Sequence, residues 1–314
     1  MQTNPIDETV LDLITKIKAK YEKNGQDFKA YLEGLLYQEY TNYWDYIQVD
    51  TLLSLQKPKT DIPDELIFIM YHQITELYFK LTIHEINQLQ ALKGNLSAQF
   101  FIERLNRMNA YFKNLTQSFE IMIQGMEPAQ FLKFRMSLLP ASGFQSAQYR
   151  LIEICATPIA NLVHKDKREA FLHKSVAEQL EAIYWKSGAT EVETGKKTLT
   201  LTQFEAKYAN EFLNHAQSNE SKNLWMLYLS MSEADQENAD LKAALRAFDK
   251  AVNIDWPLVH YKSAVRYLQK SQTDVAATGG TNWQKYLPPR FQFRIFYPEL
   301  YSQEEIDTWG TNNQ

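Results

Sequence analysis

The sequence predicts an all-α protein, and two observations carry that prediction. Apolar residues recur at three- and four-residue spacing through most of the 314 residues, which is the period of an amphipathic helix. Only 10 glycines and 10 prolines occur, too few for the frequent tight turns of a β-sandwich. Because 45% of the residues are hydrophobic and no repeat or linker interrupts them, we expect a single helical-bundle domain.

In the N-terminal half, helices are expected wherever this period persists between breaking residues. Asn24-Gly25 ends the first helix, and Pro58 ends an aromatic-rich third segment. Gly125 and Pro128 separate the last two expected helices of this half, and the helix expected over 65–92 is the most apolar. The expected ranges are 9–23, 28–37, 40–55, 65–92, 98–122 and 128–137.

In the C-terminal half, Ser146 is expected to cap a helix that follows it. Residues 187–202 are rich in Gly and Thr and predict a loop with room for a short hairpin. Asp255-Trp256-Pro257 is interpreted as a helix start, since Asp caps helices and Pro is tolerated in a first turn. The other expected helices cover 173–185, 203–231, 233–252 and 256–270.

Composition excludes several classes of protein. The net charge is −5 with Lys and Arg scattered among acids, which gives no electrostatic footprint for nucleic acid. Cys155 is the only cysteine, so no intrachain disulfide or cysteine-rich metal site is expected. Residues 1–10 lack the apolar core of a signal peptide, and no run approaches the ~20 apolar residues that span a bilayer. We therefore expect a soluble, cytoplasmic protein with neither nucleic-acid nor membrane partners.

Two of the six histidines, His72 and His260, lie in strongly apolar sequence. Each follows an aromatic residue by one helical turn, Phe68 and Trp256 respectively. Burying an imidazole costs free energy unless it gains a partner. That partner is either an ordinary hydrogen-bond acceptor in the core or haem iron, which a single histidine can hold. The other four lie beside polar or charged residues and are expected to be structural or solvated.

Arg135 stands between Phe134 and Met136, near the end of an apolar helix. A buried guanidinium needs an anionic partner, and its fork fits a carboxylate. A structural Asp or Glu and the carboxylate of an amino-acid substrate both meet that need. The 18 Tyr, 17 Phe and 6 Trp likewise suit either a cavity for a flat ligand or an ordinary core.

Several sequence blocks distinguish this chain from a generic helical protein. In chain order they read YWDYIQVDTLLSLQ from Tyr43, DELIFIMYHQITEL from Asp64, FR from Phe134, PASGFQS from Pro140, WPLVH from Trp256, TGGT from Thr278 and YPEL from Tyr297. One block alone would be weak evidence. The ordered set, over roughly residues 38–301, resembles the tryptophan 2,3-dioxygenase family.

The resemblance implies a haem b cofactor and a role for each matching residue around it. His260 would be the proximal ligand of the iron, and Ser142 would line the haem pocket. His72, the catalytic candidate, would accept a hydrogen bond from the indole N–H on the distal side, as an orienting group rather than an essential base. Phe68 would pack on the indole, since positions 68 and 72 share one helix face.

The resemblance also assigns residues to the amino-acid end of the substrate. Arg135 would hold the carboxylate, while Thr278 and the main chain of Gly279 would meet the ammonium with help from a haem propionate. It further implies an intertwined homotetramer, with residues 1–37 as an N-terminal helical segment making oligomer contacts and 38–314 as the haem-dioxygenase helical domain. The residues donated to a neighbouring subunit's site would be Tyr43, Tyr46 and Ile47.

The implied reaction inserts O₂ across the indole C2–C3 bond of L-tryptophan and gives N-formylkynurenine, the first step of the kynurenine pathway. It needs no nucleophile–base pair, because the cofactor performs the difficult step. Phe131 stands where the family pattern has Tyr, Ala277 replaces a Gly, and the stretch from His260 to Thr278 is long. These departures keep open a substituted tryptophan as substrate, or a haem-binding sensor or monooxygenase.

Overall fold

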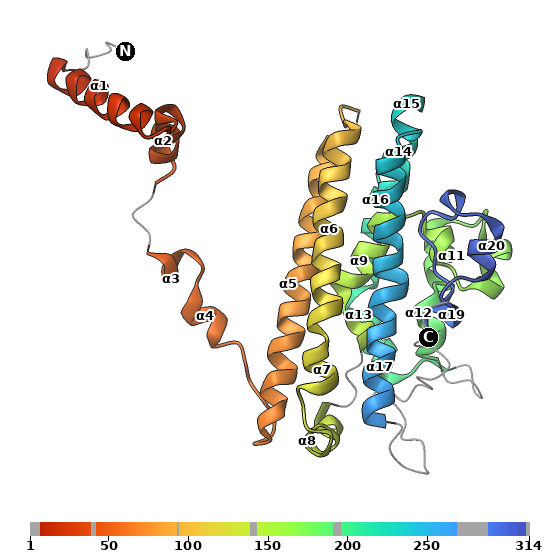
Figure 1. Ribbon diagram of the computed structural model, residues 1–314. Helices are drawn as coiled ribbons and strands as arrows, with labels where there is room; N and C mark the ends of the chain where they lie inside the picture. Colours follow the sequence, from red (N-terminus) through yellow and green to blue (C-terminus); the bar gives the residue numbers. More distant parts are fainter. Residues whose placement is uncertain are drawn as a thin grey trace. The chain divides into compact units, whose positions relative to one another are not determined.

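The regular structure of the described residues is helical, which confirms the all-α prediction. A computed structural model describes residues 7–38, 42–92, 94–138, 143–190, 196–268 and 288–311. Within these ranges there is no β-strand, only two isolated bridges, Val163–Ile183 and Thr190–Lys197 (Figure 1). The chain divides into two compact units, an N-terminal unit of residues 1–56 and a main unit of residues 57–314.

The described part of the N-terminal unit contains four helices, of which the first two have aspartate caps. The Asp7 carboxylate accepts the N–H of Thr9 at 3.0 Å, and Asp27 accepts the N–H of Lys29 at 2.9 Å. Such caps satisfy backbone donors that have no partner inside the helix. The helices are α1 (Glu8–Lys23), α2 (Phe28–Leu36), α3 (Tyr43–Tyr46) and α4 (Val49–Leu53).

The main unit is built from long helices joined by shorter ones. Its α-helices are α5 (Pro63–Ala91), α6 (Ala98–Ser118), α7 (Glu120–Gln124), α8 (Pro128–Phe134), α9 (Ala147–Ala156), α10 (Arg168–Phe171), α11 (Val176–Glu181), α12 (Tyr184–Gly188), α13 (Leu199–Asn219), α14 (Leu224–Leu229), α15 (Glu233–Gln236), α16 (Ala239–Lys250), α17 (Trp256–Leu268), α19 (Pro289–Gln292) and α20 (Gln303–Asp307). Its 3₁₀ turns are η1 (Arg135–Leu138), η2 (Gly143–Gln145), η3 (Ile159–Leu162), η4 (Lys165–Lys167) and η6 (Pro298–Leu300), and η5 (Ala251–Asp255) is a π-helical turn.

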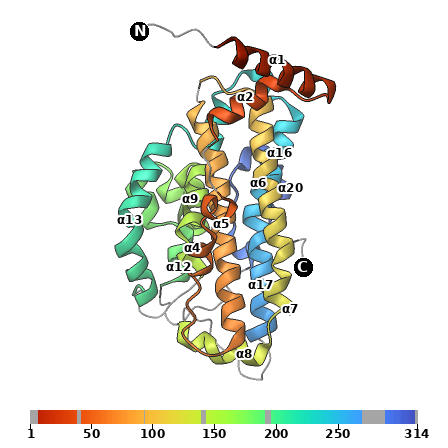
Figure 2. The ribbon, with the colours of Figure 1, turned by 90° about the vertical axis from the view of Figure 1, so that its left-hand side faces the viewer.

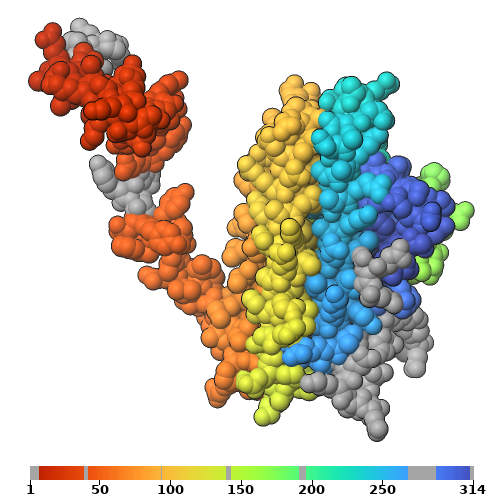
Figure 3. All heavy atoms as spheres, in the orientation of Figure 1, coloured from red at the N-terminus to blue at the C-terminus, as the bar shows by residue number. Residues whose placement is uncertain are grey.

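The long helices α5, α6 and α16–α17 lie side by side, while α9 packs on α5 and against α13 (Figures 1 and 2). Along α6 the buried side chains fall at helical spacing: Phe101, Leu105, Met108, Phe112 and Leu115. Figure 3 shows α6 closed against α16–α17 along much of their length. None of the helices in the described ranges is both long and apolar enough to cross a membrane.

Helix α5 carries His72 and is fixed at its start by carboxylates. Pro63 occupies the first turn, where its missing N–H costs nothing. The Glu65 carboxylate accepts the N–H groups of Lys59 and Thr60, both at 2.8 Å, and Asp64 accepts the N–H of Glu127 at 2.6 Å. These contacts hold the start of α5 to the preceding loop and to the start of α8.

The prediction of a helix start at Asp255 is wrong, because α16 continues through η5 into α17 as one helix. The Trp256 N–H donates to the Ala251 carbonyl, which is the i→i−5 bond of a π-helix. Pro257 explains the wider turn, since its ring would clash with the Asn253 carbonyl four residues earlier in a regular α-helix. The continuous helix therefore passes its proline by a π-turn immediately before His260.

Several other expected helices are divided, among them those over 40–55, 98–122 and 233–252 and the two over 203–231 and 173–185. The helix expected over 203–231 breaks after Asn219, and Asn223 caps α14 by accepting the N–H of Met226 at 3.0 Å. The helix expected over 173–185 is split where Ile183 adopts an extended conformation. In both places a local cap or turn overrides an uninterrupted apolar pattern.

The C-terminal segment is held to the bundle by Asp249. Its buried carboxylate accepts the N–H of Phe296 at 3.0 Å, the N–H of Tyr297 at 3.2 Å and the Asn253 amide at 2.7 Å. Burial outweighs these bonds and raises the pKa of Asp249 to about 6. The contact places residues 291–294 against the bundle next to α17.

Candidate functional site

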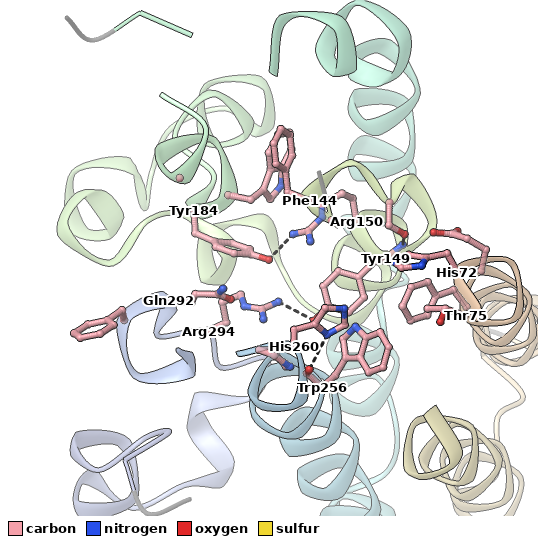
Figure 4. Close-up of a pocket in the computed structure, with 18 of the residues that line it drawn as sticks. His72, Thr75, Phe144, Tyr149, Arg150, Tyr184, Trp256, His260, Gln292 and Arg294 are labelled. Carbon is pink, nitrogen blue, oxygen red and sulfur yellow. Dashed lines mark hydrogen bonds between the residues drawn. The ribbon is translucent and has the colours of Figure 1, made fainter. Parts of the chain in front are cut away.

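A pocket of about 240 Å³ opens in the main unit between α5, α9 and α17, with residues 291–294 on a further side (Figure 4). Its wall is largely aromatic and apolar, with histidines and arginines converging on it. The lining residues used below are His72, Glu76, Phe79, Phe144, Tyr149, Arg150, His164, Tyr184, Trp256, His260 and Arg294.

His260 projects from α17 and is packed between two aromatic rings. The ring centroid of Trp256 lies 4.3 Å away, edge to face, and that of Phe119 lies 4.4 Å away. Its Nδ1 lies 3.0 Å from the Trp256 carbonyl oxygen, which can only accept, so Nδ1 carries the proton. Burial lowers the pKa of His260 from 6.5 to about 4, and the ring is neutral at pH 7. The Nε2 lone pair is then left for a ligand.

His72 projects from α5 and repeats this hydrogen bond. Its Nδ1 lies 2.8 Å from the Phe68 carbonyl oxygen, so Nδ1 again carries the proton and Nε2 is an acceptor. Desolvation by surrounding protein lowers its pKa, although much of the side chain remains exposed. His72 and His260 both line the pocket, one from each of two helices (Figure 4).

The sequence prediction missed a buried ionic network at another side of the pocket. Glu153 accepts from Arg150 at 2.8 Å and from the Tyr184 hydroxyl at 2.6 Å, and it pairs with Arg294. Arg294 also donates to the Tyr149 hydroxyl at 3.1 Å. An arginine and a glutamate three residues apart in the apolar stretch 147–156 were a visible signal for half of this network. Arg294 comes from the C-terminal segment, and no local pattern links it to them.

His164, which was expected to be a solvated surface residue, is partly buried and lines the pocket. Its side chain is about three-quarters buried, with 24% exposed, and desolvation lowers its pKa. It follows η3 and forms a backbone bond to Ala182, which places it beside the turn that divides the expected 173–185 helix.

Comparison with known proteins identifies the family. The sequence profile described as tryptophan 2,3-dioxygenase matches residues 34–278, well over half of the chain. The chain belongs to the tryptophan 2,3-dioxygenase family.

Relatives named tryptophan 2,3-dioxygenase match over different lengths. The protein of Ruegeria sp. (strain TM1040) is 42% identical over 36% of this chain and 40% of its own length. That of Bacillus thuringiensis subsp. konkukian is 35% identical over 47% of this chain and 54% of its own. These alignments span about half of each relative or less. The protein of Anaeromyxobacter dehalogenans is 28% identical over 83% of this chain and 94% of its own length.

In this family member, Arg135 does not line the pocket with the two histidines. It stands at the start of η1 with only 3% of its surface exposed, and burial lowers its pKa. It directly follows Phe134, whose ring centroid lies 5.7 Å from that of Phe68. Arg135 is therefore one residue removed from the aromatic group that contacts His72.

Phe68 connects His72 to α8. Its ring centroid lies 4.1 Å from that of His72 and 6.2 Å from that of Phe131. Phe131 in turn packs on Tyr267 of α17 at 4.6 Å. The aromatic side chain at position 131 thus belongs to a packed cluster beside His72, and it offers no hydroxyl there.

The remaining predicted site residues lie elsewhere or outside the described ranges. Tyr43 and Tyr46 in α3, and Ile47 next to it, belong to the N-terminal unit, with 72%, 79% and 40% of their surfaces exposed. Ser142, Thr278 and Gly279 lie outside the residues that the structure describes.

Proposed function

We propose that this protein is a haem-dependent dioxygenase that opens the indole ring of L-tryptophan with O₂ to give N-formylkynurenine. The observation that carries the proposal is His260. In a chain of this family, it is a neutral imidazole whose tautomer leaves Nε2 available inside an aromatic pocket.

The residues present fit haem b. A macrocycle needs apolar walls and one axial donor, and Phe79, Phe144 and Trp256 line the pocket that His260 enters. The bond from Nδ1 to the Trp256 carbonyl fixes the orientation of the imidazole and raises the basicity of Nε2, as such outer partners do for metal-bound histidines. When bound, haem supplies the activation of O₂ and the oxidative cleavage of the indole C2–C3 bond.

The chain's own residues would bind and orient the substrate. Nε2 of His72 would accept the indole N–H, and Phe68 would pack on the indole ring, since it contacts His72 directly. Arg135 would pair with the substrate carboxylate, because a buried guanidinium favours an anionic partner. Thr278 and the Gly279 main chain would meet the ammonium, and Ser142 would line the haem pocket.

We further propose a homotetramer in which residues 1–37 make oligomer contacts and each subunit donates its own Tyr43, Tyr46 and Ile47 to a neighbour's site. The exposure of these three side chains supports this, since a contiguous exposed apolar surface usually marks an interface. Helix α5 supports it independently with an exposed apolar stripe at helical spacing, 38–49% exposed: Leu66, Met70, Ile74, Leu77 and Leu81.

A cytoplasmic location and the substrate scope belong to the same proposal. Cys155 is a buried free thiol, and burial raises its pKa to about 12, which fits a reducing compartment. Phe131 favours a substituted tryptophan as an alternative substrate. Because Phe lacks the hydroxyl of the Tyr in the family pattern, its side chain suits an apolar substituent on the substrate's ring.

An aerobic assay of the reduced, haem-loaded protein tests the function. Tryptophan-dependent growth of the N-formylkynurenine absorbance is the expected result. A Soret band with no such product would instead indicate a sensor or a monooxygenase. Absence of any bound haem after purification and reconstitution would exclude all three.

A further inference from the structure

The ionic network beside the pocket holds two arginines against one glutamate. Arg150, Glu153 and Arg294 are 6%, 0% and 2% exposed, so no member reaches bulk water. The two tyrosines that join the network, Tyr149 and Tyr184, are neutral at pH 7 because burial raises the pKa of both phenols. Counted together, the five side chains carry a net charge of +1.

Within the described residues, neither Arg150 nor Arg294 forms an ion pair with a carboxylate other than that of Glu153. Burial opposes the charged form of each arginine, but the pKa of both Arg150 and Arg294 is raised above its usual value, so both are cations at pH 7. The Glu76 carboxylate on α5 is a further anion that lines the pocket, and its hydrogen bond comes from the Gln148 amide at 2.8 Å and not from either arginine. The histidines, His72, His164 and His260, all have lowered pKa values and are not anions.

A second ionic cluster in the main unit, around Glu85, provides a comparison for the net charge of the Glu153 network. Glu85 also pairs with two arginines, Arg104 at 3.3 Å and Arg107 at 3.5 Å, and accepts from the Tyr111 hydroxyl at 3.1 Å. There, however, Arg104 also pairs with Glu103 at 3.7 Å, and the side chain of Arg107 is 53% exposed, so that cluster holds no buried excess charge. An Nε–H without an acceptor occurs at Arg104 as well as at Arg150 and Arg294, so the distinguishing feature is the buried excess charge.

We propose that Arg150 and Arg294 form a carboxylate-binding subsite inside the pocket, and that it holds a propionate of the haem. An uncompensated buried charge is strongly unfavourable, and a bound carboxylate would bring the cluster to neutrality. Both guanidinium groups line the pocket that His260 enters (Figure 4). Arg294 lies beyond residue 278, where the family profile ends, so one of the two cations comes from outside the matched region.

The proposal rests on the proposed function for the identity of the ligand. The substrate also carries a carboxylate, and the same two arginines would suit it. The cofactor is favoured because the subsite shares its pocket with the haem-ligand candidate His260, while Arg135 lies by the Phe68 aromatic group. The test therefore separates the two sources of carboxylate.

The full chain is reconstituted with haem or with haem dimethyl ester, whose propionates carry no charge, and haem release to an excess of apomyoglobin is timed. We expect the parent to release the ester about tenfold to hundredfold faster than haem, because hydrogen bonds to charged groups are lost. Arg294→Gln should release haem faster by a similar factor and show little further loss with the ester. Arg294→Lys, which keeps the charge, should recover much of the difference.

The matched control is Arg104→Gln, which removes a buried arginine from the Glu85 cluster away from the pocket. It should leave haem release and the difference between haem and its ester unchanged. Thermal unfolding of the haem-free proteins is measured alongside. A purely structural role predicts that Arg294→Gln lowers stability without changing the ratio of ester to haem release, and this outcome would overturn the proposal.

A second arm compares tryptophan with tryptamine binding to the parent and to Arg294→Gln. If the variant loses affinity only for tryptophan while haem and ester release stay equal, the subsite serves the substrate and the propionate assignment is wrong. If the parent binds neither haem nor ester, the proposed function fails first. If haem binds with its axial histidine but the rate of haem release depends on neither the propionate charge nor Arg294, only the propionate subsite is wrong.

Discussion

The pocket has a histidine on each of two helices, with the same hydrogen bond to the main chain but different surroundings. On α17, the His260 ring lies between Trp256 and Phe119, and burial lowers its pKa to about 4. On α5, the His72 ring contacts Phe68 and keeps much of its surface exposed. In each case Nδ1 faces the carbonyl of the residue four positions earlier.

The helix sets the same tautomer in both histidines, and we propose that their different surroundings decide the role of each. The hydrogen bond to the i−4 carbonyl leaves Nε2 as the free nitrogen on both sides. Tight aromatic packing holds His260 in one orientation, as an axial ligand requires. The more open ring of His72 suits contact with a substrate that arrives and leaves. Each prediction below changes one side of the pocket and compares the result with the other.

The largest effect is expected from His260→Ala. Without its axial donor the protein should lose stoichiometric haem, and with it all dioxygenase activity, because no second described histidine on α17 can replace it. Pyridine haemochrome content and the Soret spectrum measure this. His84→Ala, which alters an exposed histidine on α5 away from the pocket, is the control and should retain both. Unchanged haem content in His260→Ala would remove this residue from the iron.

The next effect is expected from Arg135→Ala. Removing one member of a buried guanidinium–carboxylate pair typically costs ~2–5 kcal/mol, so KM for tryptophan should rise at least about thirtyfold. Tryptamine, which has no carboxylate, should be a poor substrate for the parent and lose little further in the variant. If tryptamine equals tryptophan in the parent, Arg135 is a structural ion-pair residue instead.

The free energy of unfolding should depend on pH, because the pKa of His260 differs between the folded and the unfolded protein. The folded pKa of His260 is about 4 and its unfolded pKa near 6.5, so the folded state binds fewer protons between these values. The contribution of His260 to the free energy of unfolding is therefore full above pH 6.5 and is lost as the pH falls toward 4. Between pH 7.5 and 5.5 the loss should be about 1.4 kcal/mol.

Urea unfolding of the haem-free parent and of His260→Leu at both pH values measures this loss. Asp249 acts in the opposite direction, because its raised pKa makes its contribution fall as the pH rises from about 4 to 6. Its effect is common to both proteins and cancels in their difference. Parallel losses in parent and variant would show that His260 titrates normally.

The smallest effect is expected from His72→Ala. A neutral hydrogen bond from the indole N–H is worth ~0.5–1.5 kcal/mol net, which corresponds to roughly twofold to tenfold in kcat/KM. Turnover should remain measurable. With 1-methyltryptophan, which has no indole N–H to donate, the parent and the variant should have nearly equal kcat/KM. Complete loss of turnover with intact haem would make His72 an essential base and contradict its role as an orienting group.

The sequence predicted the long helices and singled out His72 and His260 as candidates, because both depend on local pattern. The helix expected over 65–92 appears as Pro63–Ala91, with His72 and Phe68 on one face as the helical period requires. The interruption between α13 and α14 was not predictable in the same way. There, Asn223 caps a new helix inside an apolar run, and a cap competes with continuation on small energy differences.

Long-range contacts were beyond local pattern altogether. The π-turn before His260 depends on how Pro257 is accommodated within a helix that both ends support. The pairing of Glu153 with Arg294 joins residues 141 positions apart, and it needs the Asp249 contact that holds the C-terminal segment in place. Sequence pattern identifies the residues that can carry chemistry, but tertiary packing decides which of them meet.

The division of roles between the two histidines is tested most directly by resonance Raman spectroscopy of the ferrous protein, through the iron–imidazole stretching band. The account predicts the band in the parent and in His72→Ala, its absence in His260→Gly, and a band from free imidazole when that ligand is added back to His260→Gly. Loss of the band in His72→Ala, or its persistence in His260→Gly without added imidazole, would contradict the assignment of His260 to the iron.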